Sequence, residues 1–311
     1  MAAVSIIIPS YHDLAQQTRT SLTMMVHATQ CYCGDHEPWL CTRGKHDIIW
    51  LPQLGSCVIH WARNQMISLA LHGPTGGRPG RPPSEYFLLM DDDMLVEKHY
   101  LTRLLQHKKD IVSGICTVRR DPPVPTIRFW SKEQQQYLEP FEWDWHSQKL
   151  MEVDANGAAF MLVKRKVLEA MKQAYFECKF EREADVHKGY DKDKVDIYWN
   201  AKSALRRKRF DGASGGDAWK QKDCWWFEFL DNVVPMQWGE LGEDLSFCWK
   251  VKQLGYRIWA DPQILPGHIG IYGYSVTDYH EWVERRKNEG RTAQVQERDI
   301  SVEEPETTAV T

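Results

Sequence analysis

The feature that most constrains the fold is an apolar run, residues 87–90, that ends in three consecutive aspartates, Asp91, Asp92 and Asp93. Such an unbroken apolar run is typical of a strand covered on both faces, as in a parallel sheet. Adjacent like charges repel, so this strand end indicates that a cation or several hydrogen-bond donors lie beside it. In open α/β sheets, ligands bind beyond the carboxyl ends of the strands. The sequence therefore predicts a divalent-metal site here; the alternative is a solvated acidic turn that caps the next helix.

The composition is that of a folded protein without a strong overall charge. The chain has 311 residues, of which 42% are hydrophobic, enough for one large α/β domain or two small ones. Its 39 basic and 43 acidic residues give a net charge of −4, so a nucleic acid or membrane surface would have to be met locally. The first residues do not form a signal peptide, and no apolar run is long enough to span a bilayer. With eight cysteines, this predicts reduced thiols and a cytoplasmic protein.

The first half of the chain alternates between strand and helix patterns. A Gly/Pro-rich connector at residues 73–83 leads into the strand before the aspartates. Besides that strand, the pattern predicts strands at 4–8, 47–51 and 111–116 and helices at 58–71 and 97–107. This alternation indicates a nucleotide-binding half-sheet over residues 1–120.

The second half, residues 121–275, is less regular. Its Ala-Asn-Gly-Ala-Ala sequence at 155–159 predicts backbone that lies close to another element. A polar, aromatic-rich stretch at about 176–232 has no clean periodicity and indicates a long irregular insertion. Further elements are predicted as helices at 165–173 and 244–254, the latter stopped by Gly255, and a strand at 256–260. We expect one domain over residues 1–291 and a disordered acidic tail over 292–311.

Separated motifs look like parts of one site. They are Arg63-Asn64 in an early helix, the Asp91–Asp93 triplet before Met94, Gly242-Glu243-Asp244 before a late helix, and Gly267-His268-Ile269-Gly270 beyond it. In this order the set resembles the nucleotide-sugar-dependent glycosyltransferases of the GT-A fold, near the family-2-like group and its phage-type members. The resemblance extends from Val4 to about Tyr274, outside the insertion. It implies a Rossmann-like α/β fold with a mixed, mostly parallel central sheet flanked by helices.

The resemblance implies a metal that bridges the diphosphate of a nucleotide-sugar donor, expected to be a UDP-sugar. Asp93 would coordinate Mn²⁺ or Mg²⁺, Asp91 would lie near the ribose or a metal-bound water, and His268 would add an imidazole, which favours Mn²⁺. The metal would offset charge on the leaving nucleoside diphosphate. Asp92 departs from the family pattern, because a small residue is usual there, so the pair that contacts metal and ribose stays open; alignment with Met94 favours Asp91 and Asp93. The alternative for His268 is a core histidine bonded to backbone.

The nucleotide contacts are also implied by the resemblance. Arg63 would hold phosphate through two parallel hydrogen bonds, and Asn64 would order the turn or the base. Pro9, Ser10 and Tyr11 end the first strand, where the family seats the nucleobase. The alternative for Arg63 is a surface ion pair.

The catalytic roles fall on the Gly-Glu-Asp motif. Asp244 matches the general base of inverting members, which takes the proton of the acceptor hydroxyl, and Glu243 would orient the acceptor. In a retaining enzyme, Asp244 would instead position the acceptor or stabilise an oxocarbenium ion. The alternative for both residues is a helix N-terminal cap, which can coexist with catalysis.

A cysteine-rich segment follows the first strand. Cys31, Cys33 and Cys41, with histidines around them, are residue types that bind structural Zn²⁺, although their spacing is not that of a standard finger. The alternative is a set of reduced, partly buried thiols.

The acceptor is indicated only indirectly. The phage-type resemblance, with the basic run at 206–209 among aromatic residues, makes a hydroxylated base in DNA a candidate, which would place the protein in a host cytoplasm. A glycan or protein acceptor is the alternative, and a solvated helix face also explains the basic run.

Two other classes share this fold. A nucleotidyltransferase should carry a Gly-rich loop after the first strand, where this chain has Pro9-Ser10-Tyr11. A sugar- or nucleic-acid-binding protein could keep the fold without catalysis, in which case alanine at Asp93 or Asp244 would change binding alone.

Overall fold

A computed structural model of the chain describes residues 3–10, 16–30, 47–50, 59–72, 83–119, 123–134, 136–140, 146–211, 226–227, 242–269, 275–277 and 279–287. All structural statements below concern these residues. The predicted acidic tail at 292–311, the cysteines proposed for zinc (Cys31, Cys33 and Cys41) and Tyr11 lie outside them.

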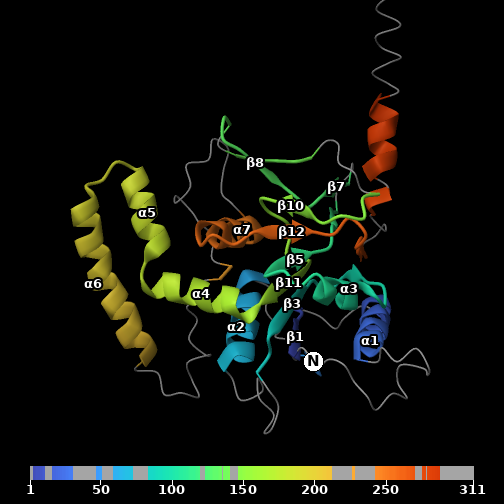
Figure 1. Cartoon of the computed structure of the whole chain (residues 1–311), viewed down its shortest axis with the longest axis horizontal. Coiled ribbons are helices and arrows are strands. Elements are labelled where there is room, and N and C mark those ends of the chain that lie inside the picture. The colour runs from blue at the N-terminus through green and yellow to red at the C-terminus, as the bar shows by residue number, and fades with distance from the viewer. Residues whose placement is uncertain are drawn as a thin grey trace, which may run out of the picture.

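A seven-stranded sheet forms the centre of the molecule (Figure 1). Its order is β10 (Met151–Val153), β12 (Ile258–Ala260), β5 (Ile111–Ser113), β11 (Phe160–Lys164), β3 (Tyr86–Met90), β1 (Ala3–Ile7) and β2 (Asp47–Trp50). The pairs β1–β2, β1–β3 and β5–β12 are parallel, whereas β11 lies antiparallel between β3 and β5, and β10 is antiparallel to β12. Five of these seven strands therefore run in one direction, which confirms the predicted α/β class with a mixed, mostly parallel sheet.

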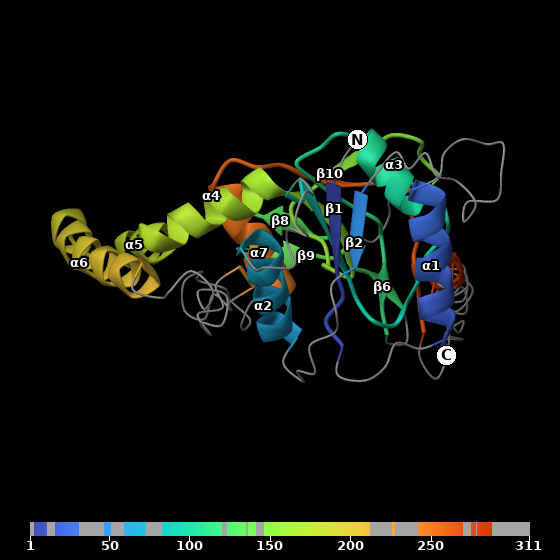
Figure 2. The ribbon, with the colours of Figure 1, turned by 90° about the horizontal axis from the view of Figure 1, so that it is seen from below.

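Helices cover both faces of the sheet (Figure 2). Because side chains alternate along a strand, Leu88 and Met90 of β3 pack with α1 (Gln16–Gln30) and α3 (Tyr100–Gln106) on one face. Phe87 and Leu89 pack on the other face with α2 (Ile59–His72), α4 (Arg165–Phe176) and α7 (Glu243–Gln253). The unbroken apolar run of β3 is thus explained by burial on both sides.

Three short two-stranded sheets complete the fold. They pair β4 (Met94–Leu95) with β13 (Gly267–His268), β6 (Thr117–Val118) with β7 (Val124–Pro125), and β8 (Phe129–Ser131) with β9 (Gln136–Leu138), all antiparallel. No described helix is both long and apolar enough to cross a membrane.

Most predicted elements are present with shifted ends. α3 begins at Tyr100 rather than 97, β5 ends at Ser113 rather than 116, and β12 begins at Ile258 rather than 256. The last shift has a clear cause, because Tyr256 belongs to the end of α7. There Gly255 has φ +81°, its N–H donates to the Lys252 carbonyl at 2.9 Å, and the Tyr256 N–H donates to the Val251 carbonyl at 3.1 Å. This is a Schellman motif, so the predicted stop at Gly255 is confirmed.

Helix α1 was not predicted from the sequence. Its buried positions follow a helical spacing, Thr18, Leu22, Met25 and Thr29, but two of the four are threonines. Threonine has low helix propensity and weakens the apolar signal. The hydroxyl of Thr29 is satisfied within the helix by the Met25 carbonyl at 2.8 Å, so it can be buried.

The prediction of an irregular insertion from residue 176 is wrong as far as residue 211. The chain there forms two helices, α5 (Lys179–His187) and α6 (Lys192–Asp211), joined through Gly189 at φ +84°. They extend away from the sheet beyond α4 (Figures 1 and 2), so they have little core-facing surface to produce an apolar period. Of the rest of the predicted insertion, only Trp226 and Phe227 are described.

Candidate functional site

The reversed strand β11 brings a second loop to the end of β3. Because β11 runs against β3 and β5, residues 154–159 before it lie at the edge where β3 and β5 end. The Asp91 N–H donates to the Ala159 carbonyl at 3.1 Å. The prediction of close backbone packing at 155–159 is confirmed, since a Cβ on Gly157 would lie 3.1 Å from the Thr126 Cβ.

Asn156 locks this loop to the end of β5. Its side chain is fully buried, and its amide donates to the Ser113 hydroxyl at 2.7 Å and to the Gly114 carbonyl at 2.8 Å. Its side-chain oxygen accepts from the Gly157 N–H at 2.8 Å and from the Thr126 hydroxyl at 2.5 Å. Every hydrogen-bonding group of the amide is therefore used to hold backbone and neighbouring side chains in place.

Asp91, Asp93 and His268 form the candidate metal group. One potential ligand atom from each lies within 4.8 Å of the others. The strand pairing explains how a histidine so far along the chain arrives there: His268 of β13 pairs with Met94 of β4, and the Ile269 N–H donates to the Asp93 carbonyl at 2.7 Å. Asp92 is partly exposed and is not part of this group.

The histidine is held in the tautomer that suits a metal. Its Nδ1 lies 2.5 Å from the Thr117 carbonyl, which can only accept, so Nδ1 carries a hydrogen and donates it. When the ring is neutral, Nε2 has a free lone pair, and Nε2 lies 3.7 Å from Asp93 Oδ1. A backbone partner that orients the second ring nitrogen is common for metal-binding histidines. His268 is buried and bonded to backbone, as the alternative interpretation expected, but Nε2 still faces the carboxylates.

Asp93 has one satisfied and one unsatisfied carboxylate oxygen. Oδ2 accepts a charge-assisted contact from Arg119 Nη1 at 2.6 Å, whereas Oδ1 is buried and has no hydrogen-bond partner among the described residues. Burial raises the pKa of Asp93, the cations His268 and Arg119 lower it, and the neighbouring aspartates raise it. A buried oxygen without a partner costs free energy, and a bound cation would satisfy it. Two carboxylates and one imidazole fit Mn²⁺.

Arg63 connects this group to the second acidic motif. Its side chain is only 1% exposed. Nη2 donates to Asp91 Oδ1 at 2.6 Å, Nη1 donates to Asp244 Oδ1 at 2.5 Å, and Nη1 lies 3.5 Å from Glu243 Oε1. Although burial lowers the pKa of Arg63, the three carboxylates raise it above its usual value, so the guanidinium stays charged. The alternative of a surface ion pair is wrong because Arg63 is buried.

The terminal nitrogens of Arg63 are thus already engaged by protein carboxylates. This geometry gives Arg63 a positioning role between Asp91 and Asp244. The direct phosphate contact expected from the sequence stays a prediction.

Glu243 and Asp244 form the first turn of α7. The N-cap is Gly242, which makes no side-chain capping bond, so the expectation that either acid is the cap is not met. Both still lie at the positive end of the helix dipole. Burial raises the pKa of Asp244, Arg63 lowers it, and the charges of Glu243 and Asp91 raise it, so that the net pKa is about 6. The Ala158 N–H also donates to Asp244 and lowers its pKa.

Asn64 orders a neighbouring backbone segment. Its side-chain oxygen accepts from the Phe227 N–H at 3.0 Å, and both residues are buried. The Phe227 ring stacks on Phe247 of α7 at 4.7 Å, with Arg63 Cζ 5.2 Å from its centroid. Of the two roles expected for Asn64, this contact favours ordering the chain. Pro9 and Ser10 are buried just beyond β1, and the nucleobase site expected there stays a prediction.

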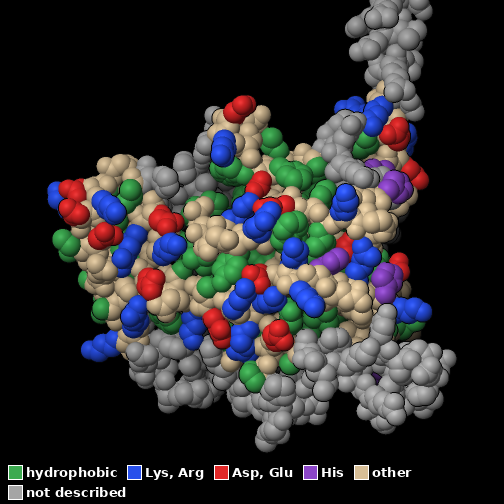
Figure 3. All heavy atoms as spheres, viewed as in Figure 1, with side chains coloured by type: hydrophobic (Ala, Val, Ile, Leu, Met, Phe, Trp, Pro, Cys, Tyr) green, Lys and Arg blue, Asp and Glu red, His purple; other side chains and the backbone are tan. Residues whose placement is uncertain are grey.

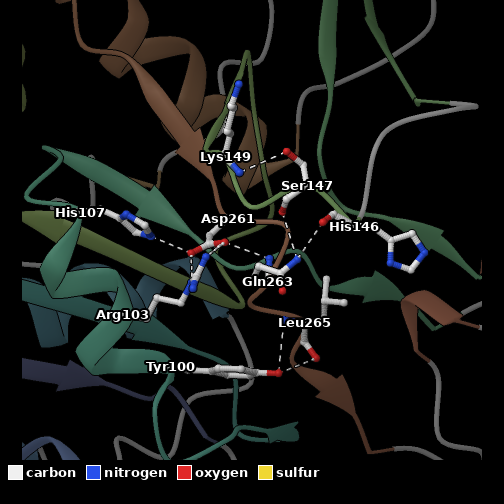
Figure 4. A network of polar contacts seen from close by, with 9 residues as sticks. All are labelled: Tyr100, Arg103, His107, His146, Ser147, Lys149, Asp261, Gln263 and Leu265. Carbon is white, nitrogen blue, oxygen red and sulfur yellow. Dashed lines mark hydrogen bonds and ion pairs between the residues drawn. The ribbon is translucent and has the colours of Figure 1, made fainter.

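A buried polar network supports the segment that leads to His268 (Figure 4). Asp261, fully buried after β12, accepts from Arg103 Nε at 2.5 Å and Nη2 at 3.1 Å, from His107 Nε2 at 2.7 Å and from the Gln263 N–H at 2.9 Å. Burial alone raises the pKa of Asp261, but the hydrogen bonds, above all that of Arg103, hold it below its usual range. The Tyr100 hydroxyl lies 3.4 Å from both the N–H and the carbonyl of Leu265.

Gly114 lets this segment approach the end of β5. A Cβ at Gly114 would lie 2.7 Å from Ile264 Cγ2, 2.9 Å from the Ile264 carbonyl oxygen and 3.0 Å from Pro266 Cδ. The Ile115 N–H donates to that same carbonyl at 2.8 Å. The path of residues 261–266, and with it the place of His268, therefore depends on a glycine at 114.

Sequence reasoning missed several residues of this site. Thr117 and Arg119, which contact His268 and Asp93, follow the predicted strand at 111–116, so their position at a strand end was the available signal. Asn156 and Ala158 lie in the loop that was singled out for its small residues. Nothing in the sequence indicated Phe227.

Neither a protein-family model nor a curated protein matches the chain. Among solved structures, one that is similar is described as "Crystal Structure of A197 from STIV". It is 13% identical, with a TM-score of 0.36 over 87% of this chain and 86% of that one. A similarity at this level carries no argument, so the functional case depends on the residues of the site.

Proposed function

We propose that this chain is a metal-dependent glycosyltransferase that moves a sugar from a nucleotide sugar, expected to be a UDP-sugar, to a hydroxyl acceptor. One observation carries the proposal: buried Arg63 joins Asp91 of the Asp91–Asp93–His268 group to Asp244 in the first turn of α7. A metal group and a carboxylate of raised pKa thus lie on either side of one guanidinium. The resemblance of the motifs to GT-A glycosyltransferases supports the same conclusion.

On the donor side, Asp91, Asp93 and His268 would hold Mn²⁺ or Mg²⁺. Such an ion, when bound, offsets the negative charge that develops on a leaving nucleoside diphosphate. The residues fit a cation because Asp93 Oδ1 is buried without a partner and the Thr117 carbonyl keeps His268 Nε2 available. Arg63 holds Asp91 in place through the hydrogen bond from Nη2 to Asp91 Oδ1, and its positive charge offsets the repulsion among the carboxylates.

On the acceptor side, Asp244 is the general base. Its carboxylate takes the proton of the acceptor hydroxyl while that oxygen attacks the anomeric carbon and the bond to the nucleoside diphosphate breaks. This displacement inverts the anomeric configuration. A pKa of about 6 leaves Asp244 ionised at neutral pH yet basic enough to accept a proton. Glu243, one residue earlier in the same helical turn, orients the acceptor.

The acceptor carries a hydroxyl group, and three classes of molecule fit the proposal. A hydroxylated base in phage-type DNA, a glycan and a protein side chain are the candidates. A catalytically inactive sugar- or nucleic-acid-binding protein is the alternative, and the raised pKa of Asp244 favours an enzyme.

The first experiment is a calorimetric titration of UDP into the full-length protein, with and without Mn²⁺. We expect binding that requires the metal and weakens by about tenfold or more in Asp93→Ala. Asp92→Ala is the matched control, because it removes a charge from the same triplet but not from the metal group. Binding that ignores the metal, or that falls equally in both variants, contradicts the assigned metal group. If neither UDP nor GDP binds, the nucleotide-sugar proposal is wrong.

The second experiment tests Asp244 once a donor is known. Asp244→Asn should keep metal-dependent UDP binding but lower the transfer rate by about 10²-fold or more. Activity of the wild type should fall as the pH drops through about 6, because protonated Asp244 cannot act as base. A rate in Asp244→Asn close to that of the wild type would remove Asp244 from catalysis.

A further inference from the structure

The hairpin of α5 and α6 forms an arm that extends from the body of the molecule (Figure 2). Side-chain contacts hold the two helices together: Trp199 Nε1 donates to Asp185 Oδ2 at 2.7 Å, and Arg182 Nη2 donates to Asn200 Oδ1 at 2.6 Å. Val195 of α6 is buried. One side of α6 therefore faces α5 and α4. The side chains on the opposite side, which we name the outer face of the arm, are exposed where the structure describes them.

Large apolar side chains are exposed on the outer face. Ile197 is 72% exposed, Leu205 59% and Tyr198 54%. Since residues three, four, seven and eight apart share one side of a helix, these three lie together with Ala201, which is also exposed. Apolar side chains exposed next to one another mark an interaction surface more often than singly scattered ones do.

The same face is basic. Lys194, Lys202 and Lys208 are exposed at positions that place them among the apolar residues, and Lys202 Nζ lies 5.5 Å from the centroid of the Tyr198 ring. Between residues 197 and 210 the sequence has five Lys or Arg and no acidic residue. In Figure 3, basic side chains are spread along the arm, whereas acidic ones gather toward its upper end.

We propose that the outer face of the arm binds an anionic lipid surface. Ile197, Tyr198 and Leu205 enter the headgroup region, while the lysines remain at the level of the lipid phosphates, as in amphipathic helices that lie in the plane of a membrane. The proposal does not depend on the glycosyltransferase activity.

Two other partners fit the outer face less well. A nucleic-acid backbone would use the lysines, but it offers no apolar surface to cover Ile197 and Leu205. A second copy of the chain, paired through the same face, would place lysines against lysines. Of these three surfaces, lipid is the one that supplies both negative charge and an apolar layer.

The test is co-sedimentation of the full-length protein with vesicles of phosphatidylserine and phosphatidylcholine, compared with vesicles of phosphatidylcholine alone. We expect about tenfold or greater preference for the anionic vesicles, weakened by added salt. The double variants Ile197→Glu/Leu205→Glu and Lys202→Gln/Lys208→Gln should each reduce this binding by about tenfold or more. Met24→Glu is the matched control, because Met24 is 56% exposed on α1, away from the arm. Because all five substituted positions are exposed, we expect each variant to be folded, and thermal unfolding checks this.

Four outcomes overturn the proposal. The first is equal sedimentation with both vesicle types, and the second is sedimentation of both double variants like the wild type. The third is binding of duplex DNA in place of anionic vesicles. If the wild type and the glutamate variant bind DNA equally and the glutamine variant does not, the outer face binds nucleic acid. A wild-type dimer in light scattering that the glutamate variant abolishes, again without vesicle binding, would assign it to a second copy.

Discussion

Replacing Arg63 with methionine tests whether the site is organised around one buried charge. Methionine keeps an unbranched apolar stem but removes the guanidinium that lies over the Phe227 ring and contacts Asp91, Glu243 and Asp244. Removing one partner of a buried ion pair costs about 3–5 kcal/mol. The three carboxylates are 21–26% exposed, and water therefore screens part of their repulsion. We expect the free energy of unfolding to fall by about 3 kcal/mol at pH 8.

The loss should depend on pH in a definite direction. The pKa of Asp244 is about 6, above its ordinary 3.8, and it should rise further when Arg63 no longer lowers it. A carboxylic acid whose pKa is raised on folding destabilises the folded state as the pH rises through that range. Near pH 5 Asp244 is mostly protonated in both proteins, so the difference between them should shrink by about 1 kcal/mol or more.

The assay is urea unfolding followed by tryptophan fluorescence at pH 5 and pH 8, for which the chain has fourteen tryptophans. Arg63→Lys is the matched control, because it keeps the charge and loses the planar fork, and it should lie between wild type and Arg63→Met. An equal loss at both pH values would mean that Arg63 matters for packing rather than for charge, and would refute the reasoning.

Three further substitutions test the supports of the site. Gly114→Ala should lower the affinity for Mn²⁺ by about tenfold in calorimetry, because the added Cβ would push the Ile264 backbone and shift His268. Unchanged affinity would show that residues 261–266 adapt freely to the added Cβ. Asp261→Asn should lower the free energy of unfolding by about 2–3 kcal/mol at pH 7. The loss should shrink as the pH falls below the ordinary aspartate pKa of 3.8, because protons then bind the unfolded chain first and the folded carboxylate only at still lower pH; a flat pH dependence in urea unfolding would contradict this. Gly255→Ala should lower the free energy of unfolding by about 1 kcal/mol in thermal unfolding without changing UDP binding, because alanine is strained at φ +81°. An unchanged free energy of unfolding would mean that the end of α7 rearranges.

Local patterns predicted the elements whose residues carry a clear period or charge. The run at 87–90 is buried on both faces in β3, and the Gly255 stop ends α7 as expected. Helix α1 escaped because Thr18 and Thr29 occupy two of its four buried positions. Helix α6 of the arm escaped because a helix with a small buried side has no strong apolar period.

The site shows the same division between local and long-range information. Asp91 and Asp93 were predicted from the strand they end, since charge at a strand end is visible along the chain. His268 was predicted only through a family resemblance, because its pairing with Met94 joins segments that nothing local connects. The carboxylate contacts of Arg63 were not predicted: the structure engages both terminal nitrogens with Asp91 and Asp244, and the phosphate contact that the sequence suggested stays a prediction.

The sequence by itself therefore determined the α/β class, the strand that ends in aspartates and the acidic first turn of α7, since burial period, charge and helix signals are properties of neighbouring residues. Only the tertiary structure decided that β11 runs backwards between β3 and β5 and that Arg63 is buried among three carboxylates. It also decided that one oxygen of Asp93 has no hydrogen-bond partner within the described part of the chain. These depend on which distant segments share a space, and electrostatic energies are set by that space. A buried guanidinium and a solvated one have the same sequence signature.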